Sequence, residues 1–285
     1  MGVVIDIISG PRGSNPGGTC KVHSLGSSFE GYFKYCYGMR IQGVSSFFAS
    51  HQPIYEATTF QLVRELGLKT TDFYVLLNRD KQVQFRNWRQ FRIHDPSGRD
   101  FYFVSRIIQN LQECPEDKAN SLIRQASPYL NSILVADIIG KRQNYKCLQC
   151  SSSQSAEIFY LDLGCSFVYA KEGYLSLPHK SPPYDSRDFR AILRRLSNYS
   201  IISLRKKTIN LEELVESIQT LHLPTLNPTS NVSLSALLST DEINEIQSYI
   251  AHNLLNSISS LRQSGILLNG NNSLNLINDC NTEPK

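Results

Sequence analysis

The stretch IISGPRGSNPGGTCKVHSLGSSFEGYFKYCY, residues 7–37, places four glycines within nine residues and then a lysine between aromatic residues. The β-branched run before the glycines predicts a strand, and residues 19–22 predict a second strand after them. Residues 24–31 indicate a turn, and the alternation over residues 32–37 predicts a third strand that carries Lys34. We therefore expect a flexible loop between two antiparallel strands, followed by a strand with a lysine.

This combination of a loop and a lysine suits the binding of a phosphate. Glycines let backbone amides approach an anion closely, and a lysine ammonium adds a point charge. The alternative is a plain Gly/Ser/Pro surface loop with an incidental lysine. The loop is not a Walker A motif, because Thr19 stands where that motif requires a lysine.

The composition limits the classes of partner. A chain of 285 residues can bury a sizeable core. A net charge of +4 is too mild to imply nucleic acid. Five arginines nonetheless cluster in the sequence, and we interpret them as solvated strand and hairpin residues, with a basic face as the alternative. They are Arg86, Arg89, Arg92, Arg99 and Arg106.

Cysteine usage and hydropathy bear on the compartment. Seven cysteines, an odd number, argue against a disulfide framework and favour a reducing compartment. We expect a cytoplasmic protein, and secretion as an effector without a cleavable signal stays open. No apolar run reaches transmembrane length, so we expect no membrane partner.

Beyond Lys34, residues 53–66 predict a helix with Pro53 near its start and Gly67 just past its end. Glu56 is expected in the first turn of this helix. Residues 73–106 predict a meander of strands. The expected buried face of the helix consists of Tyr55, Phe60, Val63 and Leu66.

The pattern becomes helical over residues 109–140, irregular over residues 141–158, and typical of a strand and turn over residues 159–169. Helices are also expected over residues 185–196, over residues 210–221, and from Ser239 toward Leu261. The last two begin with capping-box pairs, Asn210 with Glu213 and Ser239 with Glu242. Residues 222–231 are expected to form a loop.

The layout predicts an α+β protein with two lobes. The N-lobe covers residues 1–106 with strands and one helix, and the helical C-lobe covers residues 107–268. Residues 269–285 are expected to be a disordered tail. Ligands bind preferentially in the cleft between two such lobes.

Four features follow one another in the order used by protein-kinase-like folds. They are the glycine-rich loop, Lys34, Glu56 on the next helix, and Asp162 in the segment LDLG. The chain resembles the HipA-like and CtkA-like bacterial Ser/Thr protein kinases. The resemblance covers residues 5–170 and is carried by SNPGGTCKV, GYFKY, PIYEATTFQLVRELGL, LVADIIG and FYLDLGCSF.

The resemblance implies a two-lobed protein-kinase-like fold that uses ATP and Mg²⁺. It implies Lys34 and Asp162 as catalytic residues, and Asp162 with Asn144 as metal ligands. The residues that it places at the nucleotide are Ser14, Asn15, Gly17, Gly18, Lys34 and Glu56.

The chain departs from this family in the catalytic loop. Family members carry an Asp-Arg-His-x-x-Asn segment after the helix that ends at Gly140, where this chain has Gln143 in place of the aspartate and Leu148 in place of the asparagine. Gln143 cannot take a proton and Leu148 cannot bind a metal. Asn144 would supply the second metal ligand only if the loop shifts its register.

We therefore expect an ATP-binding protein that is an atypical kinase or a pseudokinase, with a protein substrate or partner that the sequence does not identify. The alternative is a scaffold that binds no nucleotide and presents a surface such as the one around Arg86–Arg106.

Overall fold

The computed structural model describes a mixed arrangement of strands and helices, which confirms the α+β class. None of the helices in this described part is long and apolar enough to cross a membrane. The described residues are 2–11, 16–36, 49–65, 69–78, 81–113, 145–149, 156–163, 216–226, 230–248 and 250, together with the short strands at 169–170, 174–175, 209–210 and 273–274.

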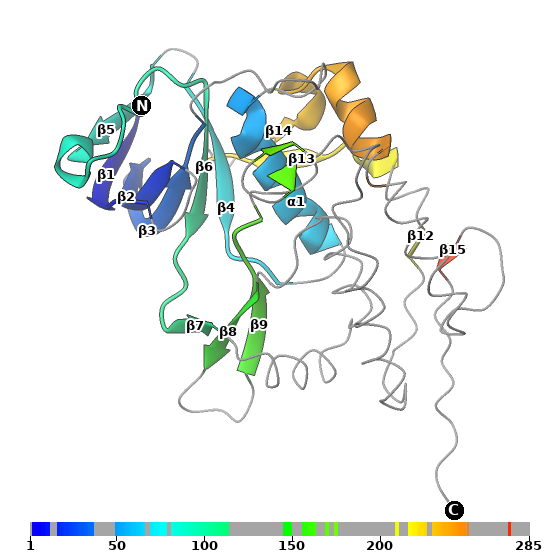
Figure 1. Ribbon diagram of the computed structural model, residues 1–285, viewed down its shortest axis with the longest axis horizontal. Coiled ribbons are helices and arrows are strands. Elements are labelled where there is room, and N and C mark those ends of the chain that lie inside the picture. Colours follow the sequence, from blue (N-terminus) through cyan, green and yellow to red (C-terminus); the bar gives the residue numbers. More distant parts are fainter. Residues whose placement is uncertain are drawn as a thin grey trace, which may run out of the picture.

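A six-stranded sheet forms the N-terminal part of the molecule, with the strand order β4-β6-β3-β2-β1-β5. Figure 1 shows this sheet with helix α1 lying against it. The elements, in chain order, are β1 (Val3–Ser9), β2 (Gly17–Ser24), β3 (Ser27–Lys34), the short 3₁₀ helix η1 (Ala49–His51), α1 (Gln52–Glu65), β4 (Phe73–Leu77), β5 (Val83–Arg86), the 3₁₀ helix η2 (Trp88–Phe91) and β6 (Phe101–Arg106).

Strands β1, β2 and β3 form the antiparallel arrangement that the glycine-rich stretch predicts. The prediction of a long turn over residues 24–31 was wrong. Only Leu25 and Gly26 lie between β2 and β3, and both have positive φ angles, of 49° and 78°. Two residues with positive φ make the tight hairpin turn that matches the twist of the paired strands, so pairing continues up to Ser24 and Ser27.

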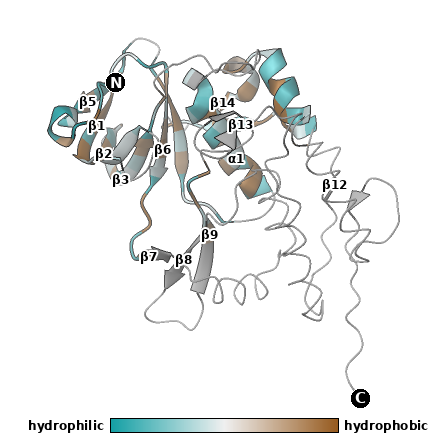
Figure 2. Cartoon of the chain, in the orientation of Figure 1, coloured by the Kyte–Doolittle hydropathy of each residue, from teal (hydrophilic) through white to brown (hydrophobic). Residues whose placement is uncertain are grey.

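The two faces of the sheet bury different sets of side chains. One face encloses a hydrophobic core whose fully buried members include Ile5, Phe33 and Tyr102. Figure 2 shows hydrophobic stretches along β1 and β6 and a hydrophilic segment around β5. The other face packs against α1, where the ring of Phe60 lies 5.0 Å from that of Phe103, between ring centroids.

Helix α1 is buried on nearly all sides, from Gln52 to Phe60 without a break. The predicted buried residues Tyr55, Phe60 and Val63 are confirmed, and Leu66 lies outside the described residues. The prediction that Glu56 lies in the first turn was wrong, because the helix begins at Gln52 and its first turn holds no acidic residue.

The predicted strand meander over residues 73–106 was also wrong in its pairing. Strands β4 and β6 pair with each other, whereas β5 crosses to the far edge of the sheet and pairs in parallel with β1. After Arg86 the chain forms η2 rather than a longer strand. The exposed arginines are consequently distributed over the sheet, since β3, β2 and β1 separate the strand of Arg106 from that of Arg86.

A second sheet contains β7 (Leu111–Glu113), β8 (Tyr145–Gln149) and β9 (Ala156–Tyr160), in the order β7-β8-β9. This corrects the expectation of irregular structure over residues 141–158 and of helix at residues 111–113. The backbone of Tyr160 donates a hydrogen bond to the carbonyl of Lys69, 2.9 Å away, which attaches the end of β9 to the segment after α1. Residues 109–110 form a turn rather than helix, whereas residues 114–140 and the helix predicted over 185–196 lie outside the described residues.

A C-terminal segment, residues 216–250, packs against α1 and β4. It contains β13 (His222–Pro224), β14 (Asn231–Ser233), the 3₁₀ helix η3 (Leu234–Ala236) and helical residues 240–248. The loop expected over residues 222–231 was wrong, because β13 and β14 pair as a hairpin. Thr225, directly after β13, forms a parallel bridge with Val75 of β4 and so adds the segment to the edge of the sheet.

The two predicted capping boxes have different outcomes. Ser239 and Glu242 form one, because the backbone N–H of Glu242 donates to Ser239 Oγ at 3.3 Å and the backbone N–H of Ser239 donates to Glu242 Oε2 at 2.9 Å. Asn210 instead lies in β12 (Ile209–Asn210), which pairs with β15 (Ser273–Leu274). Two further short strands, β10 (Tyr169–Ala170) and β11 (Tyr174–Leu175), pair with each other.

Candidate functional site

Lys34 is the last residue of β3, and its side chain points to the α1 side of the sheet with only 7% of its surface exposed. Its Nζ atom donates hydrogen bonds to two carboxylates. Glu56 Oε1 lies 2.6 Å away and Asp162 Oδ1 lies 2.7 Å away. The structure thus brings together three residues that the family resemblance assigns to one site.

Glu56 reaches Lys34 from α1, and its side chain is fully buried. Gln52, one turn earlier in the helix, donates from Nε2 to Glu56 Oε2 at 3.3 Å. Burial raises the pKa of Glu56 above its ordinary value, and Lys34 opposes this rise while the Asp162 carboxylate adds to it. Gln52 was not recognised in the sequence, although its spacing of four residues from Glu56 is the signal that places both on one face of a helix.

Asp162 reaches the same lysine from a position 128 residues away in the chain. It lies just beyond β9, after Leu161, and adopts a left-handed backbone conformation, with φ of 56°. Such a conformation is uncommon outside glycine and is found at sharp turns and functional sites. Its side chain is 60% exposed, in contrast to the buried Glu56. The turn therefore brings Asp162 to Lys34 with much of the carboxylate in contact with solvent.

Lys34 contacts two carboxylates in this group, and they determine its protonation. Burial alone would lower the pKa of Lys34, but the nearby Glu56 and Asp162 carboxylates outweigh it and hold the pKa above the ordinary lysine value. The lysine is therefore an ammonium that lies between two carboxylates. The carboxylate oxygens of Asp162 are the type of ligand that Mg²⁺ prefers.

The glycine-rich loop leads directly to this group of charges. Gly17 pairs with Lys34 across β2 and β3, so the loop joins the sheet beside the lysine. A Cβ atom at Gly17 would lie 2.1 Å from the carbonyl oxygen of Phe33, and one at Gly18 would lie 2.2 Å from that of Ser9. Close packing of the backbone therefore requires both glycines. Ser14 and Asn15 lie outside the described residues.

The segment where the family resemblance places a catalytic loop is described only from residue 145 onward. Leu148 lies in β8 and pairs with Leu111 and Glu157. Gln143 and Asn144 lie outside the described residues, so the predicted metal ligand Asn144 stays a prediction. Among the residues that are described, no group of three or more His, Cys, Asp and Glu side chains could hold a metal ion.

The arginines form separate contacts rather than one site. The Arg106 guanidinium lies 4.9 Å from the centre of the Phe29 ring, and Arg89 lies 5.0 Å from that of Trp88. Arg86 Nε lies 3.9 Å from Asp6 Oδ1. These contacts agree with the interpretation of solvated strand and hairpin residues.

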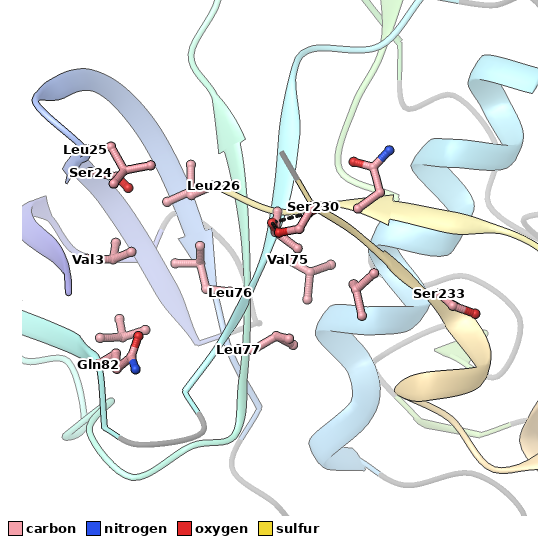
Figure 3. A pocket seen from close by; sticks show the side chains of 14 residues that line it. Val3, Ser24, Leu25, Val75, Leu76, Leu77, Gln82, Leu226, Ser230 and Ser233 are labelled. Carbon is pink, nitrogen blue, oxygen red and sulfur yellow. Dashed lines mark hydrogen bonds between the residues drawn. The ribbon is translucent and has the colours of Figure 1, made fainter. Parts of the chain in front are cut away.

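A cavity of about 600 Å³ lies away from Lys34, between the sheet and the β13–β14 hairpin. Figure 3 shows its lining, with Ser24 from the end of β2, Leu25 from the β2–β3 turn, Val75 from β4 and Ser230 from the hairpin. None of its described lining residues is charged. The cavity thus offers no cationic side chain to an anion, whereas the Lys34 site does.

No protein-family model and no curated protein sequence matches this chain. Solved structures similar to it include two kinases. The crystal structure of a Helicobacter pylori proinflammatory kinase, CtkA, has 11% sequence identity and a TM-score of 0.44, over 93% of this chain and 97% of that chain. The crystal structure of the Golgi casein kinase has 13% identity and a TM-score of 0.44, over 97% of this chain and 77% of that chain. Because both measures are low, the function proposed below rests on the contacts of Lys34, Glu56 and Asp162.

Proposed function

We propose that this protein has a protein-kinase-like fold and binds a magnesium complex of ATP at Lys34 and Asp162. The observation that supports this most is the bridging ammonium of Lys34, with Glu56 Oε1 at 2.6 Å and Asp162 Oδ1 at 2.7 Å. In protein kinases a lysine on the third strand contacts the phosphates and pairs with a glutamate of the following helix, and an aspartate after a later strand holds Mg²⁺. The elements that carry Lys34 and Glu56, β3 and α1, follow the same order.

Each residue has a role that follows from its surroundings. Lys34 supplies a fixed positive charge for the phosphates, because two carboxylates hold its ammonium in place. Glu56 positions Lys34 from inside the protein, where water does not compete for the hydrogen bond. Asp162 would hold the metal, since its side chain is partly exposed. When bound, Mg²⁺ would neutralise phosphate charge and orient the phosphates.

We propose further that the protein is a pseudokinase or an atypical kinase. The expected positions of the catalytic aspartate and the metal-binding asparagine hold Gln143 and Leu148. Phosphoryl transfer depends largely on positioning and electrostatic stabilisation, so loss of the base slows the reaction without abolishing it. We also propose that the protein acts on a protein substrate or binds a protein partner, and that it is located in the cytoplasm.

The test is the thermal stability of the protein with ATP, in the presence and absence of Mg²⁺. A ligand at one hundred times its dissociation constant adds about 2.7 kcal/mol to the free energy of unfolding. We expect wild type to be stabilised only when Mg²⁺ is present. Asp162→Asn should lose this effect while the variant remains folded.

A lysine control distinguishes the site from general attraction of ATP to positive charge. Lys21 is exposed on β2, in the same sheet as Lys34. Lys21→Ala should retain ATP binding, whereas the double variant Lys34→Met/Glu56→Gln should lose it. An unchanged stability of wild type under all conditions would refute the nucleotide site and favour the scaffold. A radiolabelled transfer assay then separates an active kinase from a pseudokinase.

A further inference from the structure

A buried carboxylate of the C-terminal segment binds the start of α1. Glu242, in the helix over residues 240–248, is only 1% exposed. Its Oε1 atom accepts hydrogen bonds from His51 Nδ1 at 2.6 Å and from Tyr55 Oη at 2.5 Å. Its Oε2 atom accepts from the backbone N–H and the hydroxyl of Ser239, both at 2.9 Å. Four donor groups from three residues therefore meet on one side chain.

The protonation of Glu242 suits this role. Burial alone would raise the pKa of Glu242, but the hydrogen bonds from His51, Tyr55 and the Ser239 backbone outweigh it. The pKa lies below the ordinary glutamate value, so the side chain is a carboxylate at neutral pH. Hydrogen bonds to a charged acceptor are stronger than those between neutral groups.

The residues that bind Glu242 alternate along the chain with those of the Lys34 site. His51 and Tyr55 are four residues apart and contact Glu242. Gln52 and Glu56 are also four residues apart, and Gln52 donates to the Glu56 carboxylate that binds Lys34. Residues four apart lie on one face of a helix. One face of this helical segment therefore contacts Glu242, and the adjacent face contacts Lys34.

The position of α1 is thereby defined from two directions. The sheet holds one face through Lys34, and the C-terminal segment holds the neighbouring face through Glu242. His51 is held in turn by Phe101 of β6, with its ring edge-on at a centroid distance of 5.3 Å. A rotation of α1 that releases Glu242 would also move Glu56 away from Lys34.

We propose that Glu242 is a positioning residue, which orients α1 so that Glu56 pairs with Lys34. The C-terminal segment then acts on the Lys34 site through α1. The expected effect of Glu242 on ATP affinity rests on the proposed function. Its expected effect on the position and accessibility of Lys34 does not.

The first experiment measures how fast Lys34 is modified by reductive methylation, followed by mass spectrometry. In wild type the side chain is 7% exposed and bonded to two carboxylates, so modification is slow. Glu242→Gln should accelerate it about tenfold, the change expected when hydrogen bonds to a charged group are lost. Asp241→Asn is the matched control, because Asp241 is an exposed acid adjacent to Glu242 in the same helix.

A second reporter distinguishes a movement of α1 from general unfolding. Cys20 lies in β2 with no exposed surface, and its alkylation reports opening of the sheet. Positioning by Glu242 predicts faster modification of Lys34 with unchanged alkylation of Cys20. If both rates rise together, or if Lys34 is modified equally in Glu242→Gln and Asp241→Asn, the proposal is overturned. If Glu242→Gln does not fold, Tyr55→Phe is used in its place, because it removes one of the four hydrogen bonds to Glu242. The same two rates, methylation of Lys34 and alkylation of Cys20, then test the proposal.

The affinity for ATP gives a separate readout. Glu242→Gln should weaken binding about tenfold in the wild-type background and have no effect when Glu56→Gln is already present, because it acts through Glu56. Equal effects in both backgrounds would contradict the proposal. If wild type binds no ATP, the proposed function fails, and the modification rates of Lys34 and Cys20 still decide the role of Glu242.

Discussion

Replacing Lys34 with methionine tests the electrostatics of the candidate site most directly. The change keeps the length and much of the volume of the side chain but removes the ammonium. Glu56, whose side chain is fully buried, would then lose the partner at 2.6 Å that compensates its charge. Breaking a buried ion pair by removing one partner costs about 3–5 kcal/mol of stability. We expect Lys34→Met to lose free energy of unfolding in this range at neutral pH.

The pH dependence of this loss has a defined sign. Burial already raises the pKa of Glu56, and removal of the opposing lysine would raise it further. An acid whose folded-state pKa is raised binds more protons in the folded state, so stability falls as the pH rises from the ordinary glutamate range to the raised pKa. Each pH unit within this window costs up to about 1.4 kcal/mol. Lys34→Met should therefore be closer to wild type in stability at acidic pH than at neutral pH.

The measurement is urea unfolding of four proteins at about pH 5, close to the ordinary glutamate range, and at about pH 8. They are wild type, Lys34→Met, Glu56→Gln and the double variant. The double variant should recover most of the stability lost by Lys34→Met, because it leaves no buried charge unpaired. The reasoning is refuted if Lys34→Met loses as much stability in the Glu56→Gln background as alone, or if its deficit shrinks as the pH rises.

Three further predictions concern the sheet. Gly17→Ala should lower the melting temperature by several degrees or prevent folding, because its Cβ atom would lie 2.1 Å from a carbonyl oxygen of β3. A variant as stable as wild type would contradict this packing. Leu25→Asn should stabilise the protein by about 1 kcal/mol in urea unfolding, since leucine at a φ of 49° is strained and Asn-Gly is the favoured sequence of such a turn. Burial raises the pKa of Cys20 to about 12, so Cys20 should resist thiol reagents at mildly alkaline pH until the protein unfolds, as mass spectrometry would show. Rapid alkylation of the native protein would count against this burial.

Local patterns predicted much of the secondary structure near the site. The spacing of hydrophobic residues, with Pro53 at the start and Gly67 at the end, located α1 to within a residue or two. These signals are local, because they act within one or two turns of the helix. The capping box of Ser239 and Glu242 was recognised for the same reason. A wrong prediction also had a local cause. The hairpin of β13 and β14 was predicted to be a loop because it contains prolines and asparagines, which are typical of loops.

The sequence by itself determined which residue types are present for phosphate chemistry, in which order they occur, and on which elements Lys34 and Glu56 lie. The tertiary structure alone decided that Asp162 reaches Lys34 across 128 residues, that β5 pairs with β1, and that Glu242 is buried against α1. The physical reason is that an ion pair or a strand pairing between distant segments depends on how the whole chain folds. Folding is driven by the burial of apolar surface, which no short stretch of sequence specifies.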